Sequence, residues 1–116
     1  MKVTFLLNGL DVAHETRAYV EKKIAAVEKF MRQLERANVD INRDKRGFYR
    51  VEVMMYEDGQ MYRAEEIAET IEAAVDAVEV KLQEQVRDVH KKNRVLERRG
   101  ARSIKKKTVL DDAARF

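Results

Sequence analysis

The stretch FYRVEVMMYEDGQMYRAEEI, Phe48 to Ile67, contains the pattern that decides the fold. In its first half, apolar residues such as Val51 and Val53 alternate with polar ones, which is the period of a half-buried β-strand. The next four residues, EDGQ at 57–60, predict a hairpin turn, because glycine accepts positive φ angles without a Cβ clash. Residues 61–67 then return as a second strand, so the stretch predicts an antiparallel β-hairpin.

Two further strands are predicted on the N-terminal side of this hairpin. Residues 37–42 (ANVDIN) alternate, with Val39 and Ile41 on one side. Residues 2–7 (KVTFLL) are apolar and partly β-branched, and the Asn-Gly pair that follows ends the strand. The sequence therefore predicts four strands in total.

A helix is predicted between the first two strands, over about residues 12–34. Asp11 is expected to be its N-cap, because a carboxylate can accept from the unpaired N–H groups of the first turn. The apolar residues that would face the core recur at three- and four-residue steps: Val20, Ile24, Val27, Met31 and Leu34.

A second helix is predicted from about residue 70. Its apolar stripe consists of Ile71, Val75, Val78, Leu82, Val86 and Val89. Gly100 is the first breaker after this stripe, and it is expected to end the helix as a C′ residue. Because little apolar sequence follows, we expect a domain over residues 1–99 and a basic, flexible tail over residues 100–116.

The element order is therefore β-α-β-β-β-α, which indicates an α+β fold. Two amphipathic helices can cover one face of a four-stranded, largely antiparallel sheet. The other face would be polar and in contact with solvent. On this face we expect Arg50, Glu52, Tyr56 and Arg63.

The charge of the chain is unevenly distributed. Its net charge is only +3. Residues 1–80 carry 12 basic and 16 acidic side chains, whereas residues 81–107 carry 11 basic and 3 acidic ones. A basic segment on an otherwise acidic chain indicates an anionic partner.

Several classes of protein are excluded or disfavoured by the composition. The chain has no cysteine, no cleavable signal pattern and no apolar run long enough to cross a membrane, so we expect a soluble, cytoplasmic protein. It has no glycine-rich phosphate loop or nucleophile elbow, and its two histidines, His14 and His90, lie far apart. We therefore expect no catalytic residues, metal, cofactor or small-molecule substrate, and no enzymatic activity.

Basic residues on the two helices are the best candidates for a binding site. If both helices pack on the same sheet face, these residues can border one groove that holds a phosphate backbone. Few aromatic residues accompany the charge, which favours contact with the backbone and shape of folded RNA over stacking on bases. The candidate RNA-binding residues are Lys22, Lys23, Lys29, Lys81, Arg87, Lys91, Lys92, Arg94, Arg98 and Arg99.

The segment AEEIAETIEAAVDAVEVKLQEQVR, residues 64–87, resembles the hallmark segment of the ribosome hibernation-promoting factor and ribosome-associated inhibitor family. The first helix, TRAYVEKKIAAVEKFM, is similar as well, and the element order is that of the family. The resemblance covers roughly residues 1–95. The chain stops too early for the domain that pairs ribosomes in long members, so the resemblance suggests either a short-type member or a shortened form of a long one.

The resemblance implies a protein that binds the small ribosomal subunit and its rRNA in the channel used by mRNA and tRNA. Such a protein inhibits translation in stress or stationary phase, and it is expected to be monomeric off the ribosome. By position, Lys23, Lys81 and Lys92 look like the family's RNA-facing residues, and Asp76 is expected to be structural. The chain departs from the family at Ala26, Glu84 and Asp88, where members often have Lys or Arg.

Two other functions fit the same pattern. Double-stranded-RNA-binding domains have the order α-β-β-β-α, although AETIEAAV lacks the lysine-rich start of their second helix. A protein-interaction module with an exposed sheet edge is the other alternative. Salt separates them, because binding to phosphates weakens steeply with salt and an apolar interface hardly responds.

Overall fold

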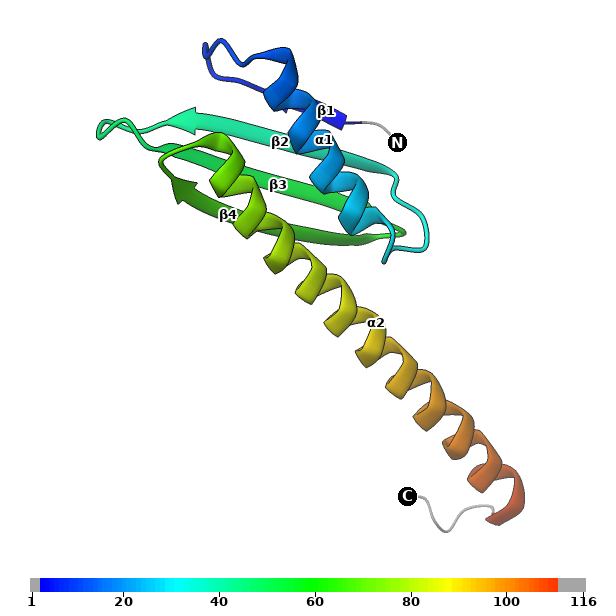
Figure 1. The fold of residues 1–116 in the computed structure, drawn as a ribbon. Coiled ribbons are helices and arrows are strands. Elements are labelled where there is room, and N and C mark those ends of the chain that lie inside the picture. The colour runs from blue at the N-terminus through cyan, green and yellow to red at the C-terminus, as the bar shows by residue number, and fades with distance from the viewer. Residues whose placement is uncertain (1–2, 111–116) are drawn as a thin grey trace. The chain divides into compact units, whose positions relative to one another are not determined.

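The computed structural model describes residues 3–110, with side chains described for residues 3–94. By its internal contacts the chain forms two compact units, Met1–Val86 and Arg87–Phe116. The predicted order β-α-β-β-β-α is confirmed (Figure 1). The elements are β1 (Val3–Leu6), α1 (His14–Glu28), β2 (Arg36–Arg43), β3 (Tyr49–Glu57), β4 (Gln60–Ala68) and α2 (Ile71–Leu110).

The four strands form one mixed sheet in the order β1-β2-β3-β4. β1 pairs with β2 in parallel, because α1 carries the chain back across the sheet, and the other two pairs are antiparallel. The turn between β3 and β4 has φ angles of 43° at Asp58 and 81° at Gly59. Positive φ at both central residues is the requirement of a tight hairpin turn, so the predicted hairpin is confirmed.

The core lies between the sheet and the two helices, which cover the same face (Figure 1). Met31 and Val89, which were predicted in the apolar stripes, are only half-buried. The other stripe residues point into the core, among them Val20, Ile24 and Val27 from α1, Val39, Ile41, Val51, Val53 and Met55 from the strands, and Val75, Val78, Leu82 and Val86 from α2. All of these side chains are almost completely shielded from solvent. The two-sided arrangement predicted from the periodicity is therefore confirmed.

The open face of the sheet differs from the prediction at Glu52, which is only 7% exposed. Its carboxylate pairs with Arg63, the cross-strand neighbour of Met54, and lies 3.8 Å from Arg50. Arg50 also pairs with Glu65, so alternating charges form a ladder across β3 and β4. The two arginines cover Glu52, and this explains its burial on a face expected to be fully solvated.

Both ends of α1 differ from the prediction. The N-cap is Ala13, without a side-chain hydrogen bond, so the proposed capping role of Asp11 is wrong. The helix ends at Glu28, one and a half turns before Leu34. The carboxylate of the buried Glu57 accepts hydrogen bonds from the backbone N–H groups of Arg32 and Gln33. These two N–H groups are therefore satisfied without the carbonyl partners that a continued helix would give them.

The start of α2 is capped by Thr70, whose hydroxyl accepts the backbone N–H of Ala73 at 3.0 Å. Its end differs from the prediction, because the helix continues through Gly100 to Leu110. Glycine costs a helix interior only about 1 kcal/mol relative to alanine, and Ala101 and Arg102 after it are strong helix formers. The flexibility predicted for residues 100–116 stays a prediction, and residues 111–116 lie outside the described residues.

The outer edge of β4 is covered by a side chain of α2. The amide of Gln85 donates to the backbone carbonyl of Arg63 at 2.6 Å and accepts the backbone N–H of the same residue at 3.1 Å. Gln85 therefore makes both hydrogen bonds that a neighbouring strand would make at this position.

Candidate functional site

Three residues of α1 face three acidic residues of α2, and we call this set the helix seam. The hydroxyl of Thr16 donates to Glu72 at 3.2 Å, and that of Tyr19 donates to Asp76 at 2.6 Å. The ammonium group of Lys23 lies 3.3 Å from Asp76 and 3.4 Å from Glu79. The seam residues are Thr16, Tyr19, Lys23, Glu72, Asp76 and Glu79.

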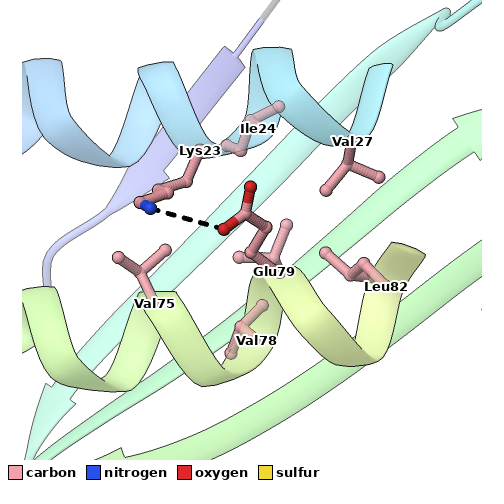
Figure 2. Close-up of a pocket in the computed structure, with 8 residues that line it drawn as sticks. Lys23, Ile24, Val27, Val75, Val78, Glu79 and Leu82 are labelled. Atoms are coloured by element: carbon pink, nitrogen blue, oxygen red, sulfur yellow. Dashed lines mark ion pairs between the residues drawn. The ribbon is translucent and has the colours of Figure 1, made fainter. Parts of the chain in front are cut away.

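The seam crosses a small, mainly apolar pocket between the two helices. Figure 2 shows the ion pair between Lys23 and Glu79 spanning it, with apolar side chains of both helices around the pair. The lining consists of Lys23, Ile24, Val27, Val53, Val75, Val78, Glu79 and Leu82. One cation and one carboxylate among six apolar residues do not make a cationic groove. This part of the surface is suited to holding the helices together rather than to binding a polyanion.

The charges of the seam stabilise each other. The hydrogen bond from Tyr19, followed by the interaction with Lys23, holds the pKa of Asp76 below its ordinary value. The hydrogen bond to Asp76 raises the pKa of Lys23, and Glu79 raises it further. Lys23 is therefore charged at neutral pH, and its charge is already compensated within the domain.

The lowered pKa of Asp76 predicts a loss of stability in acid. A carboxylate with a lowered folded-state pKa stabilises the fold above its ordinary pKa, and this contribution disappears as the pH falls through the lowered value. We expect Asp76→Asn to unfold at lower urea concentration than the wild type at pH 7, and the difference to shrink below about pH 4.

Urea unfolding at pH 7 and pH 3 measures this dependence. Asp88→Asn, an exposed acid further along α2, is the control and should leave the pH dependence unchanged. A difference between wild type and Asp76→Asn that is the same at both pH values would show that the seam charge contributes nothing.

The other basic residues predicted in the first unit have different surroundings. Lys81 pairs with Glu66 of β4, on the flank of α2 away from the seam. Lys22 on α1 and Lys29, directly after the end of this helix, are exposed. Thus Lys23 and Lys81, two residues that the resemblance assigned to RNA, are both ion-paired inside the domain. Their role in RNA binding stays a prediction.

The remaining predicted residues belong to the second unit. Arg87, Lys91, Lys92 and Arg94 are exposed. Arg98 and Arg99 lie on the helical backbone of α2, and their side chains are outside the described residues. Because the predicted groove combined residues of both units, its existence stays a prediction.

The two units carry opposite net charges. Residues 1–86 have 13 Lys and Arg against 17 Asp and Glu, and residues 87–116 have 11 against 4. The first unit is therefore acidic by four charges, while the second is basic by seven. Attraction to a polyanion should be concentrated in the second unit.

Sequence reasoning missed the helix seam, although the sequence contains a signal for it. Glu72, Asp76 and Glu79 recur at steps of four and three residues, so they share one flank of α2. Thr16, Tyr19 and Lys23 recur at steps of three and four residues on α1. Two matching polar rows on helices that cover the same sheet face indicate a contact between them.

Two other searches of the described residues gave no candidate site. Within residues 3–94, no three acidic, histidine or cysteine side chains come together in a way that could hold a metal ion. Among the described helices, none combines the length and the apolar character that crossing a membrane requires.

Known structures and families show what this fold is similar to. One similar structure is the N-terminal domain of Protein Y from Thermus thermophilus, with a TM-score of 0.59 and 27% identity over 72% of this chain and 98% of that one. Another is a ribosomal subunit interface protein from Coxiella burnetii, with a TM-score of 0.67 over 78% of this chain and 98% of that one. At 17% identity, this second similarity shows the fold alone. None of the curated proteins compared with the chain matches it.

The family model for sigma 54 modulation protein / S30EA ribosomal protein matches residues 3–94. This range contains the whole sheet, α1 and the part of α2 that bears the seam and the Gln85 contact. It also contains the segment at residues 64–87 whose resemblance was noted in the sequence, and it confirms that resemblance. The chain therefore belongs to the sigma 54 modulation protein / S30EA ribosomal protein family.

Proposed function

We propose that this protein binds the small ribosomal subunit in the channel used by mRNA and tRNA, and thereby inhibits translation in stress or stationary phase. The observation that carries the proposal is the family match over residues 3–94. The fold agrees with it, because the similar structures include a Protein Y domain and a protein described as lying at the ribosomal subunit interface.

The proposed inhibition is steric. A folded domain that occupies the channel excludes other ligands from it, and no bond needs to be made or broken. The first unit suits this role, because the seam and the apolar core hold α1 and residues 71–86 of α2 together. The basic second unit provides attraction to rRNA, which the acidic first unit lacks as a whole.

Co-sedimentation with purified small ribosomal subunits tests the proposal. We expect the protein to pellet with the subunits and to be displaced by excess tRNA. Binding that tRNA cannot displace would contradict occupation of the channel, and an absence of binding would contradict ribosome association altogether. Tight binding to a plain RNA duplex without binding to the subunit would instead support a general double-stranded-RNA-binding domain.

A charge-reversal pair tests whether the basic second unit contributes. We expect Lys91→Glu/Lys92→Glu to weaken subunit binding at least tenfold, because phosphate contacts are lost and repulsion is added. The matched control is Lys45→Glu/Arg46→Glu, which reverses two adjacent exposed charges between β2 and β3. It removes an exposed ion pair with Asp44 and a cation–π contact between Arg46 and the ring of Phe48. Equal weakening by both variants would show that only the total charge matters.

A further inference from the structure

The basic residues of the second unit follow the period of the helix on which they lie. The backbone of α2 is helical to Leu110, so residues separated by steps of three and four lie on the same side of it. Beginning at Arg87, Lys or Arg recurs at steps of four, three, four, four and three residues. We call these six residues the cationic row: Arg87, Lys91, Arg94, Arg98, Arg102 and Lys105.

The cationic row spans about five turns of α2. From Arg87 to Lys105 the helix makes about five turns at 3.6 residues per turn, so the two ends of the row return to the same side. The rise over this distance is roughly 27 Å. The three members whose side chains are described, Arg87, Lys91 and Arg94, are all exposed.

Half of the row lies beyond the region that the family model matches, which ends at residue 94. Arg98, Arg102 and Lys105 are therefore not accounted for by membership of the family. A helical basic row that continues for about three further turns adds a possible binding surface to the domain.

We propose that the cationic row binds the phosphate backbone of base-paired RNA along one side of α2. The inference rests on the proposed function, because the base-paired RNA that a ribosome-binding protein meets is a helix of the rRNA. It goes further in naming the RNA structure that is bound and the row of residues that binds it.

The chemistry of residues 87–110 favours a duplex over single-stranded RNA. This segment contains no Phe, Tyr or Trp, so it cannot stack on exposed bases, which is the usual means of holding single strands. Basic positions that repeat along a helix over roughly 27 Å match regularly spaced phosphates over the same length, and a duplex provides them. The segment also lacks the large aromatic residues with which basic helices insert into membrane surfaces.

The chain offers a control that removes the same number of charges outside the row. Within the row, Lys91, Arg98 and Lys105 are spaced by seven residues. In the first unit, Arg17, Lys45 and Arg46 are exposed basic residues that are not among the candidate RNA-binding residues.

The experiment compares the full chain with Lys91→Gln/Arg98→Gln/Lys105→Gln and with Arg17→Gln/Lys45→Gln/Arg46→Gln. Glutamine is a good helix former, so circular dichroism should show equal helix content in all three proteins. Binding to a fluorescently labelled RNA duplex is measured by anisotropy at several salt concentrations between 50 and 200 mM. Vesicles containing anionic lipid form a second arm.

We expect the row variant to bind the duplex at least tenfold more weakly at about 100 mM salt. The slope of log K against log salt concentration should become shallower by the contribution of roughly two to three phosphate contacts. The control variant should stay within about threefold of the wild type. Equal weakening of both variants, no weakening of the row variant, or binding to vesicles but not to the duplex would each overturn the proposal.

Small-subunit sedimentation separates this inference from the proposed function. If the wild type pellets with subunits while duplex binding is absent or independent of the row, the inference fails and the proposed function stands. If the wild type binds the duplex through the row but never pellets with subunits, the proposed function fails and the row remains an RNA-binding site.

Discussion

Leu82→Ala should lower the free energy of unfolding by about 2–5 kcal/mol, which is the usual cost of removing a fully buried leucine side chain. Leu82 is 1% exposed and lies with Val27 and Val53 in the lining of the space between the helices. Figure 2 shows its side chain directed toward α1 from the neighbouring helix. Alanine would leave a void here, because the helices are fixed by the seam and cannot close over it completely.

Urea unfolding followed by circular dichroism measures this loss. Val80→Ala is the control, because Val80 lies two residues away on the same helix and is 55% exposed. We expect this control to change stability by less than about 0.5 kcal/mol. A similar small change for Leu82→Ala would show that the packing of α2 on the sheet is not what stabilises the fold.

Glu57→Ala should also be strongly destabilising, at about 2–4 kcal/mol, because several hydrogen-bond donors lose one common acceptor. The side chain of Glu57 is only 4% exposed. Its carboxylate accepts the backbone N–H groups of Arg32 and Gln33 and the hydroxyl of Tyr62 at 3.0 Å. Burial and the hydrogen bond to Glu57 both raise the pKa of Tyr62, so this hydroxyl keeps its proton at neutral pH.

Tyr62→Phe separates the parts of this network. It removes the hydroxyl and keeps the buried ring, so we expect a cost of only about 1 kcal/mol. Amide hydrogen exchange of Arg32 and Gln33 should accelerate in Glu57→Ala and stay nearly unchanged in Tyr62→Phe. Slow exchange in both variants would show that the segment between α1 and β2 does not depend on the carboxylate.

The fold was predictable because its main features repeat along the chain. Alternation from Val51 to Met55, the Asp58-Gly59 turn and the three-to-four-residue stripes of the helices each reflect one buried face. Burial of a face is a property of many residues at once, so single exceptions do not change the result. The side of the sheet that the helices cover followed from the same alternation.

Features that depend on a single contact were not predictable. The end of α1 is set by Glu57, which is 29 residues further along the chain than Glu28, and no local pattern connects the two. The burial of Glu52 likewise depends on Arg63 in the next strand. In the candidate site, the number of basic residues was visible in the sequence, but the ion pairs that neutralise two of them were not. Lys23 and Lys81 have carboxylate partners that only the packing of α2 brings near.

The contact between Gln85 and the backbone of Arg63 has a consequence for how this protein meets other chains. β4 lies at one edge of the sheet, and an uncovered edge can recruit a strand from another molecule. The amide of Gln85 satisfies the N–H and the C=O of Arg63, near the middle of that edge. A recruited strand would first have to displace it. One side chain therefore opposes the pairing of a foreign strand at the middle of β4.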